Sequence, residues 1–419
     1  MSIFALKGNI IYSESREKLC IVSNGYLVCE EGISKGVFEE LPEKWKDIEV
    51  KDYGEQLIIP GLSDIHLHAP QYAFRGLGMD MELLEWLDTY TFPEESKYQD
   101  LEYAKKAYEI FVEDLKRNGT TRVCVFATIH EEATILLMDL LEQSGIKGYV
   151  GKVSMNRNSP AYLCEDTPKE NVRNWLDVVK GRYRRIQPIL TPRFTPSCTD
   201  DLMEDLAKLQ KEYHLPLQSH LSENPSEVAW VQELEPESSC YGDAYDRLGA
   251  FGSNGKTVMA HCVYSGEEEC ELMKKRNVFI AHCPQSNTNL ASGVAPAKKY
   301  IQQGFSIGLG SDIAGGASIS ILRAMADAIQ ASKLRWRLLD SSWEPLTFEE
   351  AFYMGTKGGG AFFGNVGSFE EGYEMDALVI DDEELRHPQD ITVKDRLERM
   401  IYLSEQVRFT DIYVSGKII

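Results

Sequence analysis

Residues 57–68 read LIIPGLSDIHLH, and this stretch decides the fold. A short apolar run leads into His66 and His68, two histidines separated by a single residue. Residues two apart on a β-strand point to the same face of the sheet, so the two imidazoles can share one metal ion. The stretch therefore predicts a strand that ends in a metal-binding pair.

Seven further apolar runs follow, and they alternate with helical segments. The runs are residues 121–127, 149–154, 186–191, 216–221, 257–262, 277–283 and 305–310. Among the intervening helices we predict 101–116, 135–143 and one that begins with a capping box of Ser265 and Glu268. Eight strands with helical crossovers over roughly 270 residues predict an α/β fold, a (β/α)8 barrel of the TIM type.

Both ends of the chain have a different pattern. Short strands are predicted at residues 9–12 and 25–29, and again at 376–381 and 411–414. We therefore expect the termini to meet in a small β-sandwich domain made of residues 1–60 and 368–419. Residues 61–367 then form the barrel.

More metal-binding side chains lie at the ends of the predicted strands. His220 ends the fifth strand, His261 ends the sixth and Asp312 follows the eighth. The carboxyl ends of the strands form the catalytic face of this fold. Three imidazoles with one carboxylate suit zinc or ferrous iron and leave a position for water, as a catalytic site requires.

Two acid–base candidates accompany these ligands. Glu223 lies three residues after His220, where it is either a proton shuttle near the ion or a solvated loop acid. His261 is either packed at the barrel mouth or hydrogen-bonded to the attacking water, and we favour this hydrogen bond over direct ligation.

The remaining histidines and two cysteines have weaker claims. His282 could border the site or be structural, and His130, His214 and His387 are predicted at the surface. Cys262 and Cys283 each neighbour a histidine on a strand, so alternation turns them toward the core.

Composition limits the partners and the compartment. The net charge is −22, with 66 acidic and 44 basic residues, which disfavours nucleic acid and anionic membranes. The nine cysteines are odd in number and form no CxxC pair, and the first residues lack a signal-peptide pattern, so we expect a reducing cytoplasm.

Several longer motifs resemble a known family. They are PGLSDIHLHAPQYAF at 60–74, LEWL at 84–87, YTFP at 90–93, PRF at 192–194, QSHLSEN at 218–224 and GLGSDIAGG at 308–316. The histidine and aspartate pattern resembles the amidohydrolase superfamily, and the more particular motifs resemble the guanine deaminase family within it.

The resemblance implies hydrolysis of guanine to xanthine and ammonia in purine catabolism or salvage by a zinc-bound hydroxide, in a protein that is a homodimer. The implied ligands of the single ion are His66, His68, His220 and Asp312, since the fourth strand ends without a lysine that could carry a bridging carbamate. Asp312 would take the proton of the water, and Glu223 would protonate the ring nitrogen and the leaving amine.

The same resemblance implies which residues bind the purine. Gln71 and Arg193 would read its edge, Phe194 would pack on its ring, and His68 and His220 would also contact it. An arginine only donates hydrogen bonds, so it suits the carbonyl and ring nitrogen of guanine and disfavours the amine of adenine.

Two alternatives remain open. The same machinery could act on 8-oxoguanine, a pterin or a triazine, because the metal site does not encode the ring. A catalytically silent relative that serves as a scaffold is the other alternative, although all four ligands and Glu223 are present.

Overall fold

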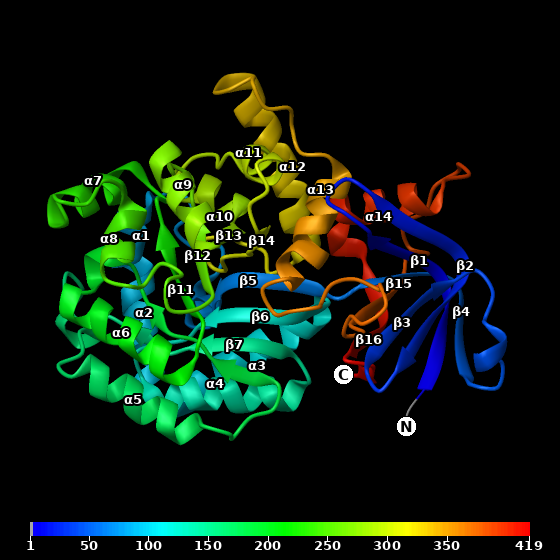
Figure 1. Cartoon of the computed structure of the whole chain (residues 1–419), viewed down its shortest axis with the longest axis horizontal. Helices are drawn as coiled ribbons and strands as arrows, with labels where there is room; N and C mark the ends of the chain where they lie inside the picture. The colour runs from blue at the N-terminus through cyan, green and yellow to red at the C-terminus, as the bar shows by residue number, and fades with distance from the viewer. Residues whose placement is uncertain (1–2) are drawn as a thin grey trace.

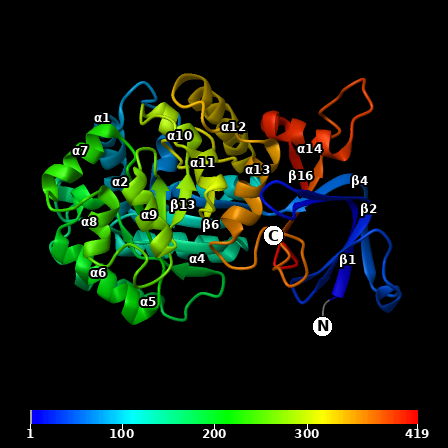
Figure 2. The same cartoon turned by 45° about the horizontal axis from the view of Figure 1, so that its top comes forward.

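The computed structural model describes residues 3–419 and has two parts (Figure 1). Parallel strands surrounded by helices form the larger part, and a mixed sheet that carries both termini forms the smaller one. The view in Figure 2 shows the same division from another side. No helix among the described residues is long and apolar enough to cross a membrane.

Strands from both ends of the chain form one seven-stranded sheet in the order β17-β16-β15-β4-β1-β2-β3. Their bounds are β1 Ile3–Ser13, β2 Leu19–Glu30, β3 Ile33–Phe38, β4 Glu49–Pro60, β15 Ala377–Asp381, β16 Arg408–Val414 and β17 Lys417–Ile418. The predicted meeting of the termini is confirmed, because β15 pairs with β4. A sandwich of two separate sheets and the domain boundaries at 60 and 368 stay predictions.

The larger part is a TIM-barrel-type α/β fold built on two four-stranded parallel sheets. The first holds β5 Leu62–His68, β6 Thr120–Phe126, β7 Lys147–Gly151 and β9 Ile186–Pro188, and the second holds β11 Leu217–Leu221, β12 Thr257–His261, β13 Phe279–His282 and β14 Ile307–Leu309. A bridge between Leu190 and Leu217 joins the sheets on one side. On the other side the amide of Asp312 donates to the carbonyl of His66 at 2.9 Å.

Three predicted strands are broken in the structure, and one of them, the run 149–154, is divided between β7 and β8 Val153–Ser154. The run 57–68 is divided between β4 of the mixed sheet and β5 of the barrel, so the prediction of one continuous barrel strand is wrong. Gly61 lies at the break, where a Cβ would come within 2.2 Å of Thr121 Oγ1 and 2.9 Å of Asp376 Cβ. The fourth predicted strand likewise ends at Pro188, and the short β10 Thr191–Pro192 instead pairs with β8 Val153–Ser154.

Helices cover the outside of the barrel strands (Figure 1). The helices of the described residues are α1 Leu83–Trp86, α2 Phe92–Ser96, α3 Leu101–Arg117, α4 Glu131–Ser144, α5 Pro168–Val179, α6 Asp200–Tyr213, α7 Pro225–Leu234, α8 Tyr241–Arg247, α9 Glu267–Arg276, α10 Pro284–Asn289, α11 Ala297–Gln302, α12 Ile321–Leu338, α13 Phe348–Tyr353 and α14 Val393–Tyr402. Of these, α14 packs between α12 and β2 of the mixed sheet. The helix predicted at 101–116 is confirmed as α3, and α4 begins four residues before its predicted start at 135. The predicted capping box is wrong, since Gly266 is the N-cap of α9.

A buried ion-pair cluster joins the bottom of the barrel to the mixed sheet. Arg122 on β6 donates to both carboxylate oxygens of Asp376, at 2.6 and 3.0 Å, and to Glu374 at 2.8 Å. Lys147 and Ser415 also contact Glu374, each at 2.7 Å. These charges are all paired, so the cluster fixes one part against the other and leaves the opposite, carboxyl end of the strands for chemistry.

Candidate active site

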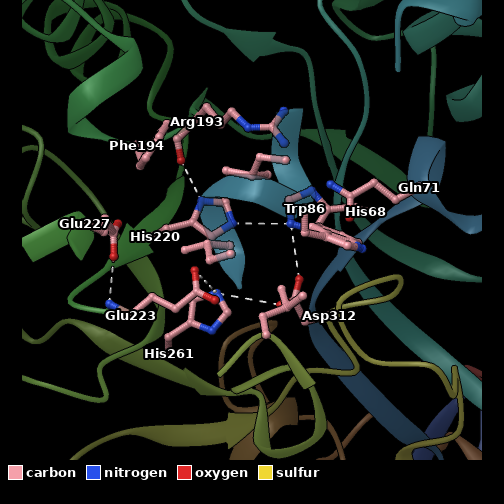
Figure 3. A pocket seen from close by; sticks show the side chains of 13 residues that line it. His68, Gln71, Trp86, Arg193, Phe194, His220, Glu223, Glu227, His261 and Asp312 are labelled. Atoms are coloured by element: carbon pink, nitrogen blue, oxygen red, sulfur yellow. Dashed lines mark hydrogen bonds and ion pairs between the residues drawn. The ribbon is translucent and has the colours of Figure 1, made fainter. Parts of the chain in front are cut away.

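The predicted metal-binding residues meet at the carboxyl ends of the barrel strands. His66 and His68 lie on β5, His220 on β11, and Asp312 directly after β14. Except for His66, they line one cavity, together with Glu223 and His261 (Figure 3). The prediction that His66 and His68 point to the same face of the strand is confirmed, because their ring centroids are 5.0 Å apart.

The side-chain geometry fits a metal ion. Oδ1 of Asp312 lies 3.2 Å from Nε2 of His66 and 3.3 Å from Nε2 of His68, and Nε2 of His220 lies 3.3 Å from that of His68. Nε2 of His66 is buried and has no hydrogen-bond partner among residues 3–419. Nδ1 of His220 lies 2.6 Å from the carbonyl oxygen of Arg193. A proton on Nδ1 leaves the lone pair of Nε2 directed at the other ligands, and this is the tautomer that metal binding requires.

Protonation states at neutral pH also suit a cation. Burial lowers the pKa of His66 to about 4 and that of His220 well below its ordinary value. Burial would raise the pKa of Asp312, but His66 and His68 outweigh it and hold this pKa well below its usual range. His66 and His220 are therefore neutral and Asp312 is ionised, the forms in which these side chains ligate metal.

The backbone at the mouth takes unusual conformations. Ser222, His261 and Asp312 have φ values of 47°, 75° and 46°, in the left-handed region that L-residues rarely adopt. Gly310 lets β14 approach β5, because a Cβ there would lie 2.9 Å from the Cβ and the carbonyl oxygen of His66. Such strain is maintained where the surrounding structure holds functional groups in place.

Glu223 is a buried acid next to the predicted ligands, which contradicts its alternative as a solvated loop residue. It is 4% exposed, and burial and the neighbouring Asp312 raise its pKa to about 8. Ser292 donates to Oε1 at 3.1 Å, and the carboxylate of Glu227 accepts from the Glu223 amide at 2.9 Å. Glu223 is thus protonated at neutral pH and can donate a proton.

His261 faces Glu223 and Asp312. Its Nε2 lies 3.5 Å from Oε2 of Glu223 and 3.7 Å from Oδ2 of Asp312. Within the described part of the chain this nitrogen has no hydrogen-bond partner. Nδ1 lies 2.8 Å from Oδ1 of Asn287, which orients the ring. The arrangement suits a hydrogen bond to a water or oxygen between these groups.

The predicted purine-binding residues line the other side of the same cavity. Gln71, Arg193 and Phe194 all contribute to its wall (Figure 3). The wall also contains apolar side chains that the sequence analysis did not identify, namely Leu83, Trp86, Leu87 and Leu290. A flat aromatic ligand therefore has apolar surfaces for its faces and polar groups for its edge.

Several hydrogen-bonding partners of the site were also missed. They are Glu95, Glu227, Asn287 and Ser292. Only Glu227 had a usable signal, because Asn224 and Glu227 have the spacing of a capping box, which the structure contains.

Of the six residues with weaker claims, three are buried, one is partly buried and two are exposed. Cys262 and Cys283 are fully buried as predicted, although Sγ of Cys283 lies within 4.8 Å of ligand atoms of His66, His261 and Asp312. His282 is buried, and burial lowers its pKa to about 4. His214 and His387 are exposed, whereas the surface prediction for His130 is wrong because its side chain is partly buried and burial lowers its pKa.

Fold and site together define an amidohydrolase, and the comparison of the sequence with family models agrees. The model described as the amidohydrolase family matches residues 57–419. The chain belongs to this family. It is therefore a hydrolytic enzyme by family.

Within the family the chain is similar to guanine deaminases. It is 38% identical to that of Dictyostelium discoideum, with 98% of this chain and 96% of the relative covered, and 37% identical to that of Mus musculus, with 90% and 87% covered. A solved guanine deaminase from C. acetobutylicum, with bound guanine in its active site, is 46% identical at a TM-score of 0.96, and both chains are covered completely. The resemblance to guanine deaminases is thereby confirmed.

Proposed function

We propose that the protein hydrolyses guanine to xanthine and ammonia. The observation that carries this proposal is that one cavity contains both metal-binding side chains, at His66, His68, His220 and Asp312, and the donors of Arg193 and Gln71. Arg193 and Gln71 lie in motifs similar to those of guanine deaminases, and a 46% identical relative was solved with guanine bound.

His66, His68, His220 and Asp312 would hold one zinc ion per subunit, with ferrous iron as the alternative. A bound ion of this kind supplies Lewis acidity that activates water as a nucleophile near neutral pH. Imidazole and carboxylate donors suit either metal. The fourth-strand region ends at Thr191 and Pro192. No lysine stands there that could bridge two metal ions, which supports a single ion.

The acidic groups of the mouth divide the proton transfers between them. Asp312 is ionised and accepts a proton from the attacking water. Glu223, protonated at neutral pH, donates to the ring nitrogen beside the carbon that bears the amino group. The water oxygen adds to that carbon. The Glu223 carboxylate then takes the hydroxyl proton of the adduct and passes it to the amino group, so that the carbon–nitrogen bond breaks and ammonia leaves. The proton held by Asp312 returns to Glu223 and restores both groups for the next turnover. His261 hydrogen-bonds the attacking water or the product oxygen.

The opposite wall selects the ring. Arg193 and Gln71 offer N–H donors to the carbonyl oxygen and ring nitrogen of guanine, and Phe194 packs against the ring. His68 and His220 border the reacting edge. Adenine presents an amine where guanine has its carbonyl, and a buried donor left unpaired costs about 1–3 kcal/mol.

The direct test is incubation of the zinc-supplemented protein with guanine, with the loss of guanine and the formation of xanthine followed by ultraviolet absorbance. We expect conversion, a bound metal in elemental analysis, and loss of turnover after treatment with a chelator. Adenine, 8-oxoguanine, a pterin and a triazine serve as comparison substrates. Metal without turnover of guanine would indicate another ring, and neither metal nor turnover would indicate a scaffold.

The family resemblance also supports a role in purine catabolism or salvage and a homodimeric state. All nine cysteines are free thiols, which supports a reducing compartment such as the cytoplasm. Light scattering during size-exclusion chromatography would give a mass twice that of the 47.4 kDa chain if the dimer is correct.

A further inference from the structure

Glu95 lies in the short helix α2, behind the wall that Gln71 and Arg193 contribute to the cavity. It is 2% exposed, which is unusual for a carboxylate. Among the described residues, no hydrogen bond joins Glu95 to a predicted metal ligand. The proposed reaction assigns it no step, so its burial next to the purine side needs another explanation.

The carboxylate of Glu95 contacts both purine-reading side chains. NH1 of Arg193 donates to Oε2 at 2.6 Å, and NH2 donates to Oε1 at 3.1 Å. Nε2 of Gln71 also donates to Oε1, at 3.1 Å. One acceptor group thus holds two donor groups that lie on the same side of the pocket in Figure 3.

These contacts determine how Gln71 and Arg193 face the cavity. A carboxylate only accepts hydrogen bonds, so the Gln71 amide must turn its nitrogen toward Glu95, while its oxygen accepts from the amide of Ala314 at 3.3 Å. The guanidinium of Arg193 lies over the ring of Phe92, 5.2 Å from its centroid. Both groups keep N–H donors that Glu95 does not use, and these donors can face a ligand.

Charge gives Glu95 a second effect. Arg193 is 3% exposed, and its charge is balanced by Glu95 alone among the salt bridges of residues 3–419. Without this partner the buried guanidinium would attract water or an anion. It would then no longer point toward a neutral purine. The pair keeps this wall neutral overall while it still presents donors.

We propose that Glu95 is the positioning residue for purine recognition. It fixes the orientation of Gln71 and Arg193 and neutralises the guanidinium, so that a neutral ring with a carbonyl oxygen and an adjacent nitrogen binds. This role rests on the proposed deamination of guanine. It acts on binding and leaves the reacting groups at the metal-binding side unchanged.

The test is the substitution Glu95→Gln, which keeps the size of the side chain and places an amide N–H against the donors of Arg193. We expect KM for guanine to rise by at least about tenfold while kcat changes less than about threefold, because only the binding wall is disturbed. Zinc content and the thermal midpoint are measured on the same preparations. Loss of zinc, or a fall in kcat with an unchanged KM, would overturn the proposal.

Glu94 provides a matched control in the same helix. It is also buried, at 7% exposed, but its carboxylate contacts Lys97 and Tyr103 instead of the purine wall. Glu94→Gln should leave KM within about twofold of the wild type. An equal rise of KM in both variants would mean that any disturbance of α2 has this effect, and the positioning role would be wrong.

A double substitution separates positioning from a general structural role. In an Arg193→Ala background, Glu95→Gln should raise KM by much less than it does in the wild type, since its main target is gone. Full additivity of the two effects would contradict the proposal.

Calorimetric binding of guanine to the metal-depleted protein distinguishes failure of the proposal from failure of the proposed function. If the wild type binds guanine when metal-depleted but does not deaminate it when loaded with zinc, the proposed function is wrong, and the role of Glu95 is then decided by whether Glu95→Gln raises the dissociation constant for guanine. Wild-type protein that neither binds nor deaminates guanine overturns both.

Discussion

The two ends of the barrel each bury a cluster of charged side chains, but the clusters differ in how completely these side chains are paired. At the bottom, Arg122 is matched by Asp376 and Glu374 with hydrogen bonds of 2.6–3.0 Å. At the mouth, Nε2 of His66 and Nε2 of His261 have no hydrogen-bond partner in the described structure. Burial costs the same kind of desolvation energy at both ends. A cluster that satisfies itself joins two parts of a protein, whereas one with unused lone pairs is organised for a ligand.

The largest expected effect tests the mouth. Glu223→Gln removes the proton donor and should lower kcat about 10³-fold. Metal content should stay the same, and the thermal midpoint should not fall, because a neutral amide replaces an acid that is buried beside Asp312. Steady-state kinetics and elemental analysis measure these results. Unchanged turnover would remove Glu223 from the mechanism, and Glu267→Gln on the exposed start of α9 is the control.

Arg122→Met should have the next largest effect, and it tests whether the ion-pair cluster at the bottom stabilises the fold. Removing one partner from a buried ion-pair cluster leaves carboxylates uncompensated, so the free energy of unfolding should fall by about 3 kcal/mol. The folded protein should keep its kcat. Denaturant titration measures the free energy of unfolding. The exposed pair of Arg117 and Glu113 provides a control, since Arg117→Met should cost less than about 1 kcal/mol. Equal losses of unfolding free energy in both variants would contradict a stabilising role of the Arg122 cluster.

Arg193→Ala disturbs the ligand side of the mouth. Guanine would lose the donors that read its carbonyl edge, so KM should rise about 10- to 100-fold with a smaller change in kcat. Initial rates over a range of guanine concentrations measure both constants. If neither constant changes, Arg193 does not read the purine. Arg173→Ala, on the surface of α5, should leave both constants as they are.

The smallest effect is the acid dependence of the bottom cluster. Burial would raise the pKa of Glu374, but Arg122, Lys147 and Ser415 outweigh it and lower this pKa from its ordinary value of 4.5 to about 2. Stability from this group is therefore complete above pH 4.5 and is lost as the pH falls toward 2. Unfolding of Glu374→Gln should depend less on pH in this window than unfolding of the wild type. Equal slopes would contradict the pairing, and exposed Glu371→Gln is the control.

Much of the site could be predicted because it depends on local periodicity. The spacing of His66 and His68 determines a shared face on any strand, and the ends of parallel strands meet at one edge. That reasoning placed His220, His261 and Asp312 correctly at the mouth. The motifs similar to guanine deaminases added Gln71, Arg193 and Phe194, which composition and periodicity do not distinguish.

Other features escaped the sequence analysis because they depend on contacts between distant residues. The break at Gly61 follows from the close approach of Thr121 and Asp376, which no local pattern encodes. Glu95 is 98 positions from Arg193 in the chain, and Ser292 is 69 positions from Glu223. Acidic and hydroxyl side chains such as these are common at surfaces, so the sequence offers no sign that they are buried partners.

By itself the sequence predicted the TIM-barrel-type class and the gathering of the candidate metal-binding side chains at the mouth, because alternation along a strand is a property of the backbone. Only the tertiary structure decided which charges are paired and which remain free for a ligand. Pairing depends on the position of atoms from separate elements to within the length of a hydrogen bond, and packing of the whole chain sets that position.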